Sequence, residues 1–337
     1  MILDDRIKAF EKLRNILVNI RNHPDFDSLI THAYKNNSWF SEFHILHAFH
    51  SLTKMISPLK LRQWISLYPE IKIQKRIGVI IPSNIPLVGF YDFLCVLLTG
   101  HVFVGQLASS NLVLLPFLSR ELCKIDPRFK SFIFFEEKIR NIDFLIFSGN
   151  DNSSNIISYH FRDIPCIIRQ HRNSIAVLNG KETLEDYQKL AHDVFIYFGF
   201  GCRNISKIFI PHSFDFSLLI EVFEKNNYSV NHQDYFDNYH YQKSFLKINN
   251  FSFKELSNIL LVESNNINSP ISVLYYEYYE EVNSIRRRMV DQKDKIQCIL
   301  SNDMFLPNSI QFGEAQSPSL LQSPDGIDVV HALVCAI

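Results

Sequence analysis

The run RIGVIIP at residues 76–82 decides the fold class, because the pattern of the chain changes there. It is a short, continuous apolar run, which is typical of a strand buried on both faces of a parallel sheet. Before it, DDRIKAFEKLRNILVNI and SEFHILHAFHSLTKMI carry apolar residues at helical spacing, so residues 1–70 are expected to be helical. After it, strand-like and helix-like runs alternate, which favours a doubly wound α/β sheet.

The alternation continues through most of the remaining chain in two series. The expected strands of the first are VFVGQL (102–107), SFIFFEE (131–137), DFLIFS (143–148), CIIRQ (166–170) and SIAVL (174–178). Its expected helices cover residues 86–99, 112–123, 153–160 and 182–197. The second has strands at 207–211, 258–262, 271–276 and 295–300, with helices at 214–226 and 277–291. In the second helix EYYEE and RRR are expected to form solvated faces.

The composition is that of a globular protein with no strong overall charge. Of 337 residues, 47% are hydrophobic and 20% are charged, and the formal net charge is −1. This balance gives no field that would draw the chain to nucleic acid or to an anionic membrane. The first residues lack the apolar stretch of a signal peptide, so we expect a cytoplasmic protein.

The apolar stretch IPLVGFYDFLCVLLTGHVFVG at residues 85–105 approaches the length of a membrane span. It is interrupted by Pro86, Asp92, Gly100 and His101. We interpret it as a buried helix followed by a buried strand, with no membrane span.

The six cysteines are scattered, with no C-x-x-C pair, and are expected to be free thiols in a reducing compartment. His44, His47 and His50 are at helical spacing, but neither a carboxylate nor a cysteine adjoins them. No metal site is therefore expected.

The segment FGFGCRN at residues 198–204 contains the first candidate for chemistry, Cys202. Gly199 and Gly201 would let the backbone bend and bring amide N–H groups near the sulfur. Arg203, and a helix N-terminus if one begins there, would favour the nucleophilic thiolate. Taken alone, the signal is weak, because a single cysteine is more often a small buried hydrophobic residue.

Two loops after expected strands contain further candidates. Asn84 in IPSNIPLVGF lies at the carboxyl end of a strand, where α/β sheets place ligand sites. Its amide would serve as an oxyanion donor or only as a helix cap. FSGNDNSSN at 147–155 is a strand–glycine–helix junction that suits a pyrophosphate, but with Gly149 alone it also fits an ordinary turn.

In this order, these segments resemble the acyl-CoA reductase family, typified by the LuxC-type fatty-acid reductase and belonging to the aldehyde-dehydrogenase superfamily. The resemblance covers roughly residues 75–337. Its strongest parts are NIPLVGFYDFLCVLLTGH, the stretch from DFLIFSGN to RNSIAVLNGKET, YFGFGCRNISKIFIP and QFGEAQSPSL.

The resemblance implies a fold and a domain plan. The expected fold is α/β and aldehyde-dehydrogenase-like, with a doubly wound cofactor-binding domain, an α/β catalytic domain and a helical N-terminal segment. The implied limits are a helical segment at 1–75, a nicotinamide cofactor-binding domain at 76–170, a catalytic domain at 171–310 and a C-terminal segment at 311–337.

The resemblance also assigns roles to residues. Cys202 falls on the nucleophile and Asn84 on the oxyanion-stabilising asparagine. Ser148, Gly149 and Asn150 fall on the loop that approaches the cofactor's phosphates. Gln106 falls where many relatives carry a cofactor-facing lysine. Because glutamine offers no cation to a 2′-phosphate, the implied NADPH could be replaced by NADH.

A second departure concerns the water-activating glutamate of acid-forming aldehyde dehydrogenases. The matching stretch, Ile168 to His171, contains no carboxylate, and Glu182 and Glu185 follow on an expected helix. Hydrolysis of an acyl-enzyme needs such a base, whereas reduction of the acyl group does not. The sequence therefore favours acyl-CoA reduction.

The predicted reaction is NAD(P)H-dependent reduction of a long-chain fatty acyl-CoA to its aldehyde through a cysteinyl thioester. Two alternatives remain: an acyltransferase or thioesterase that uses the same acyl-cysteine, and a non-catalytic subunit of an acyl-reductase complex. The implied partners are the acyl-CoA substrate, an acyl-activating or acyl-protein partner, and further copies of the chain in a homo-oligomer.

Overall fold

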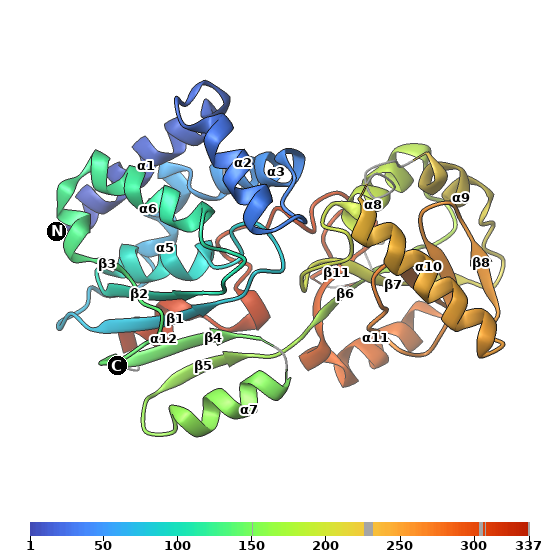
Figure 1. Cartoon of the computed structure of the whole chain (residues 1–337). Helices are drawn as coiled ribbons and strands as arrows, with labels where there is room; N and C mark the ends of the chain where they lie inside the picture. Colours follow the sequence, from blue (N-terminus) through green and yellow to red (C-terminus); the bar gives the residue numbers. More distant parts are fainter. Residues whose placement is uncertain (150, 226–231, 303–305, 307, 336–337) are drawn as a thin grey trace. The chain divides into compact units, whose positions relative to one another are not determined.

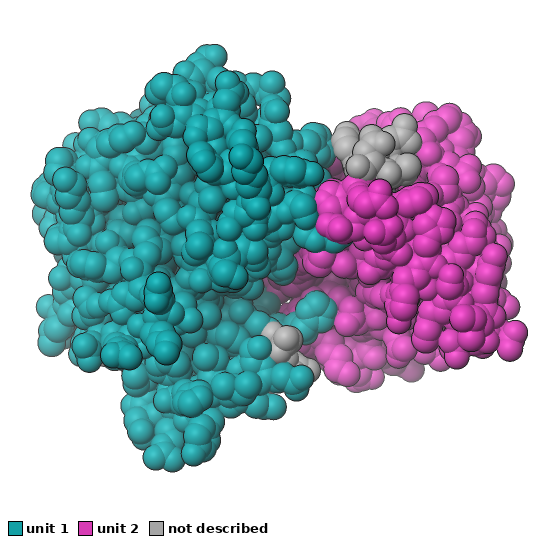
Figure 2. Space-filling model, viewed as in Figure 1, with its two compact units in different colours: residues 1–171, 317–337 teal, residues 172–316 magenta. Residues whose placement is uncertain are grey.

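A computed structural model describes residues 1–149, 151–225, 232–302, 306 and 308–335 (Figure 1). The chain forms two compact units, which are coloured separately in Figure 2. Unit 1 comprises residues 1–171 and 317–337, and unit 2 comprises residues 172–316. The two parts of the expected C-terminal segment therefore belong to different units, since residues 311–316 fall in unit 2 and the rest in unit 1.

Within the described residues, unit 1 is built on a five-stranded parallel sheet in the order β3-β2-β1-β4-β5. The strands are β1 (Arg76–Ile81), β2 (Val102–Leu107), β3 (Ile133–Phe135), β4 (Phe144–Ser148) and β5 (Cys166–Arg169). The order reverses between β1 and β4. In open α/β sheets, ligands bind beyond the carboxyl ends of the strands at such a reversal.

Helices cover both faces of this sheet. The main apolar cluster joins β1 and β2 with a helical layer and with the returning helix α12. That layer consists of α1 (Leu3–Val18), α2 (Phe26–Asn36), α3 (Glu42–Met55), α4 (Pro58–Ile65), α5 (Phe90–Thr99) and α6 (Leu114–Ile125). A smaller cluster on the opposite face includes side chains of α7 (Asp151–His160), and α12 (Val329–Cys335) packs against α5. The expected helical start of the chain is confirmed.

Unit 2 has a second sheet, in the order β11-β6-β7-β10-β9-β8, of which only β8 is antiparallel to its neighbour among the described strands. The strands are β6 (Asn173–Val177), β7 (Ile205–Pro211), β8 (Phe253–Glu255), β9 (Leu260–Glu263), β10 (Val273–Tyr279) and β11 (Ile296–Leu300). Helices α8 (Leu184–Phe195) and α9 (Ser217–Glu224) share one apolar cluster with it, and α10 (Gln233–Ile248) and α11 (Val282–Asp291) pack in two others.

The expected α/β class is confirmed, but several expected boundaries differ from the structure, two of them by four residues or more. Residues 277–279 end strand β10 instead of starting a helix, and α11 begins only at Val282. Helix α5 begins at Phe90, four residues after the expected start, because residues 83–89 form turns in which Leu87 has a φ of 60°.

The apolar stretch at residues 85–105 divides into α5 and β2, as expected. None of the helices in the described part of the chain has the length and apolar character needed to cross a membrane.

Candidate functional site

Cys202 lies in a sharp turn that leads directly into strand β7. Phe198, Gly199 and Gly201 have φ values of 57°, 92° and 89°. Three left-handed residues within four positions reverse the chain tightly, and glycine adopts this conformation without steric cost. The turn leaves Cys202 half-buried and not enclosed in a core. No helix begins at Cys202 in the described part of the chain, so the condition for a helix N-terminus near the sulfur is not met.

Hydrogen bonds fix the backbone of this turn. Ser174 Oγ donates to the carbonyl oxygen of Cys202 at 2.9 Å, and the amide of Cys298 donates to Ser174 Oγ at 3.2 Å. Ser174 Oγ also lies 2.9 Å from Cys298 Sγ. Because the hydroxyl proton is directed at Cys202, the Cys298 thiol donates in this last contact. Burial raises the pKa of Cys298, which keeps that thiol protonated.

Arg203 is held by a second set of contacts. Its Nη1 donates to the carbonyl oxygen of Ala315 at 3.0 Å. The Gly313 and Ala315 amides donate to the Asp193 carboxylate at 2.5 and 3.2 Å. Asp193 is fully buried, and its burial raises its pKa to about 7, against the effect of these two donors. The chain around Cys202 is thus anchored to the segment 313–315.

The two glutamates closest in sequence to the missing base have other contacts. Glu182 accepts from the amides of Asn179 and Gly180 at 2.6 and 3.0 Å, which closes the turn before α8. Glu185 forms an exposed ion pair with Lys189 at 2.7 Å. Both carboxylates stabilise local structure, and this use accounts for them without catalysis.

In unit 1, two predicted loops lie at neighbouring strands of the same sheet edge. Asn84 follows β1 by three residues, and Ser148 ends β4. β1 and β4 are adjacent parallel strands at the reversal of strand order, so these loops flank the crevice position of the fold. Asn84 is exposed and its Oδ1 accepts from the Ile85 amide at 3.1 Å. Because α5 begins only at Phe90, Asn84 does not cap it.

The third residue of the predicted phosphate loop, Asn150, lies outside the described residues. Gly149 is described, and a Cβ at this position would meet the Phe147 ring at 2.4 Å. Its amide donates to the carbonyl oxygen of Arg169 at 3.1 Å. Helix α7 begins at Asp151, immediately after the loop.

A buried ion pair that sequence reasoning missed supports this loop. Arg169 donates to both oxygens of Asp92 at 2.7 and 2.8 Å, and to Ser148 Oγ at 3.4 Å. Each charged side chain is only 6% exposed. Burial opposes the charge of Arg169, but the neighbouring Asp92 outweighs this effect and raises the arginine's pKa above its ordinary value. The two partners are 77 positions apart in sequence.

Gln106 lies near the end of β2 and is half-buried. Its Oε1 accepts from the Ile139 amide at 3.4 Å, a long contact that holds the side chain weakly. It pairs in register with Ile80 of β1.

Another charged group in unit 2 was not predicted as a site. Lys207 on β7 is fully buried, donates to Ser264 O at 2.8 Å and forms an ion pair with Glu277, which also pairs with Arg288. Burial lowers the pKa of Lys207 to about 8, against the effect of Glu277. Glu277 was expected on a solvated helix face, and its place in strand β10 next to β7 overturns that expectation.

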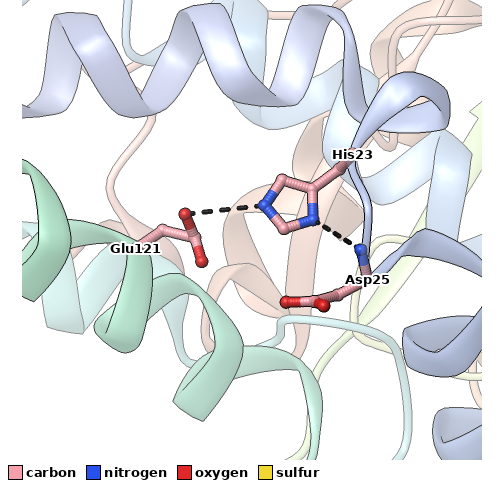
Figure 3. A group of neighbouring side chains, drawn as sticks. All are labelled: His23, Asp25 and Glu121. Carbon is pink, nitrogen blue, oxygen red and sulfur yellow. Dashed lines mark hydrogen bonds and ion pairs between the residues drawn. The ribbon is translucent and has the colours of Figure 1, made fainter.

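Among the described residues, the one group of three potential metal ligands is His23, Asp25 and Glu121 (Figure 3). His23 Nδ1 accepts a hydrogen bond from the Asp25 amide at 3.2 Å, while Nε2 lies 3.6 Å from Glu121. A neutral imidazole that accepts at Nδ1 has its proton on Nε2, the atom that would have to bind the metal. Metal-ligating histidines instead donate from the second nitrogen. The group therefore serves as a contact to α6.

The three histidines of α3 do not converge either. Ser41 Oγ lies 2.7 Å from Nδ1 of His44, which is buried, whereas His50 is exposed. The six cysteines, all within described residues, form no disulfide.

Comparison with known proteins shows what these features are similar to. Residues 75–226 match the family model of the acyl-CoA reductases (LuxC). Over this segment the chain is similar to the LuxC acyl-CoA reductases. The match includes Asn84, Gln106, the 148–150 loop and Cys202. A comparison of the chain with curated proteins found no match.

Solved structures with a similar fold are aldehyde dehydrogenases. The aldehyde dehydrogenase PutA of Anabaena variabilis is 13% identical, with a TM-score of 0.63 and coverage of 88% of this chain and 74% of that one. An aldehyde dehydrogenase of Burkholderia cenocepacia is 11% identical, with a TM-score of 0.64 and coverage of 85% and 71%. An indole-3-acetaldehyde dehydrogenase of P. syringae, solved with NAD+, is 9% identical, with a TM-score of 0.66 and coverage of 95% and 76%. The chain has the aldehyde-dehydrogenase fold.

Proposed function

We propose that this protein is a LuxC-type reductase that converts an acyl-CoA to the corresponding aldehyde, with Cys202 as the nucleophile. The observation that carries the proposal is the turn at 198–202. Its three positive-φ residues present a half-buried cysteine at the start of β7, and its carbonyl is fixed by Ser174. A structural cysteine would not need a tight turn that holds Phe198 in the left-handed region, whereas a nucleophile needs both access and a fixed position.

The chemistry follows from the residues of the chain. The Cys202 thiolate attacks the thioester carbonyl, the carbon–sulfur bond to CoA breaks, and CoA leaves while the acyl group stays on Cys202. The Asn84 amide and the backbone N–H of Cys202 are the proposed donors to the oxyanion. A nicotinamide cofactor, when bound, would supply hydride to the acyl carbon, and the aldehyde leaves as its bond to the Cys202 sulfur breaks. In balance, acyl-CoA, NAD(P)H and one proton give aldehyde, CoA and NAD(P)+.

The loop residues of unit 1 fit a dinucleotide. Ser148 and Gly149 lie at the strand-order reversal, and Gly149 is crowded by Phe147 so that a side chain there would displace the ring. Arg169, which is paired with Asp92, donates a long hydrogen bond of 3.4 Å to the Ser148 hydroxyl. Ser148, Gly149 and Asn150 are therefore the proposed pyrophosphate contacts, with Gln106 toward the adenosine ribose.

Reduction is favoured over hydrolysis because the expected water-activating carboxylate is missing and the next two along the sequence have other contacts. No carboxylate lies in residues 168–171, and Glu182 and Glu185 are engaged in a turn and a surface pair. The acyl group is thus expected to stay bound to Cys202 until hydride reduces it. A long-chain acyl group and a cytoplasmic, lipid-metabolic role are part of the proposal, as are an acyl-activating partner and a homo-oligomer.

The test is cofactor oxidation, followed by near-UV absorbance, with the full chain, tetradecanoyl-CoA and either NADPH or NADH. We expect oxidation that requires acyl-CoA, is abolished in Cys202→Ala and persists in Cys166→Ala, a control at an exposed cysteine of β5. Release of CoA that depends on Cys202 but not on cofactor would instead establish an acyltransferase or thioesterase. Absence of both reactions over several chain lengths would indicate a non-catalytic subunit.

A further inference from the structure

A cavity of about 310 Å³ lies at the amino edge of the first sheet. Its walls include Gln74, which precedes β1, Gly100, which precedes β2, and Phe132, which precedes β3. The start of α1 and the end of α5 complete it. The strands are parallel, so this edge is opposite the carboxyl edge that carries Asn84 and Ser148. The cavity is therefore separate from the proposed cofactor crevice.

A buried arginine lines this cavity without an acceptor. The Arg6 side chain belongs to a residue that is only 9% exposed. Within the described part of the chain its guanidinium makes no hydrogen bond or ion pair, and its Nε is both buried and unsatisfied. Its Nη1 packs directly over Gly100, where an added Cβ would lie 1.8 Å from it. Gly100 has a φ of 93° and ends α5.

A bound anion would stabilise an unpaired guanidinium in this position. Arginine does not lose its proton in proteins, so burial cannot be relieved by neutralisation. Burial disfavours the charge and lowers the pKa of Arg6, against the effect of Glu70. Glu70 lines the cavity but is exposed and forms no ion pair with Arg6. The carboxyl end of α5 offers only partial negative charge, which is a smaller compensation than a bound anion.

The remaining walls define the rest of the ligand. Ile65, Leu98, Phe132 and Val334 are apolar, and the Gln74 amide is engaged by the carbonyl oxygen of Gly100 at 2.9 Å. The charged groups of the lining are the side chains of Arg6, Lys72 and Glu70 and the α-amino group of Met1, so positive charge is in excess. This balance suits an anion. At about 30 Å³ for each small group, the volume holds about ten non-hydrogen atoms.

We propose that this cavity binds a carboxylate with a short apolar tail, of the medium-chain fatty-acid class. The carboxylate would receive two parallel N–H bonds from Arg6, the geometry that a guanidinium fork favours. The tail would lie against Leu98, Phe132 and Val334. The inference does not rest on the proposed reductase function, because no residue of the cavity belongs to that site.

The test is calorimetric titration of the full chain with sodium octanoate, which has ten non-hydrogen atoms. We expect one site per chain that is weakened at least tenfold in Arg6→Met and only partly in Arg6→Lys, which keeps the charge but loses the fork. Arg120→Met, at an exposed arginine of α6, should bind as the wild type does. Val334→Phe should also weaken binding, because the ring fills the cavity while Arg6 is untouched.

Ligand controls separate the charge from the tail. 1-Octanol, acetate and inorganic phosphate should each bind at least tenfold more weakly than octanoate. Cys202→Ala should keep the octanoate site, which distinguishes it from an acyl site at the nucleophile. The proposal is overturned if Arg6→Met binds octanoate like the wild type, if 1-octanol or phosphate binds as tightly as octanoate, or if the wild type binds no octanoate at millimolar concentration. If Arg6→Met fails to fold, the Val334→Phe titration decides.

Discussion

The Asp92–Arg169 ion pair should control the stability of unit 1. Arg169→Met removes the guanidinium and leaves the Asp92 carboxylate, only 6% exposed, without its two donors at 2.7 and 2.8 Å. Leaving one member of a buried pair unpaired typically costs about 3–5 kcal/mol. Asp92→Leu should lower the free energy of unfolding by a similar amount, because it leaves the buried Arg169 guanidinium without its anion. The double variant should be less destabilised than either single variant, because no buried charge remains.

Tryptophan fluorescence during urea unfolding measures this effect selectively. Both tryptophans, Trp39 and Trp64, lie in unit 1. A control is Arg62→Met, which breaks the exposed Asp4 pair at 2.6 Å, where the two side chains are 47% and 40% exposed. It should change the free energy of unfolding by less than about 1 kcal/mol.

Two results would contradict a stabilising Asp92–Arg169 ion pair. Costs of the two single variants that simply add in the double variant would show that Asp92 and Arg169 do not stabilise each other. A cost below about 1 kcal/mol for Arg169→Met would show that the Asp92 carboxylate is solvated or protonated without difficulty.

Three further predictions concern other charged and polar groups. Burial raises the pKa of Asp193 from 3.8 to about 7. As the pH rises, the carboxyl group of the unfolded chain ionises before that of the folded chain. The free energy of unfolding should therefore fall by up to about 4 kcal/mol between pH 4 and pH 7. Urea unfolding followed by circular dichroism should show a flatter pH dependence in Asp193→Asn, and an unchanged slope would contradict the assignment. Glu277→Gln leaves the fully buried Lys207 without its anion and should lower the free energy of unfolding by about 3–5 kcal/mol in the same assay, whereas a loss below about 1 kcal/mol would mean that Ser264 alone suffices. Gln106→Lys should lower the KM for NADPH relative to NADH, by about tenfold for one charge-assisted contact with the 2′-phosphate, and equal KM ratios in the two proteins would remove Gln106 from the cofactor site.

The strongly apolar elements could be predicted from the sequence because burial on both faces leaves a continuous signal. β1 is such a strand, and all ten residues of α5 are buried. The turn at 198–202 was also indicated, since Gly199 and Gly201 precede the cysteine, and both have positive φ. These features depend on short stretches of chain, which is why they can be inferred locally.

Features that depend on pairing between distant residues were missed. Nothing in YYEYYEE signals that Glu277 meets Lys207, because that contact exists only once β7 and β10 lie side by side. The same holds for Asp92 and Arg169. Helix α10 was missed because its sequence is polar and aromatic, with only Tyr235, Tyr239 and Leu246 buried along it. Its contacts with β9 and β10 hold it in place.

The return of the chain to unit 1 after residue 316 has a consequence for synthesis on the ribosome. Helix α12 completes the apolar cluster around α5, yet all of unit 2 is translated between these two helices. At ordinary elongation rates of about 5–20 residues per second, the surface of α5 that α12 covers stays uncovered for roughly ten seconds or more. Unit 1 is synthesised first but completes its folding last. During that interval, the nascent chain exposes the apolar surface of α5 to chaperones. Unit 2 can then fold before unit 1, which precedes it in the sequence.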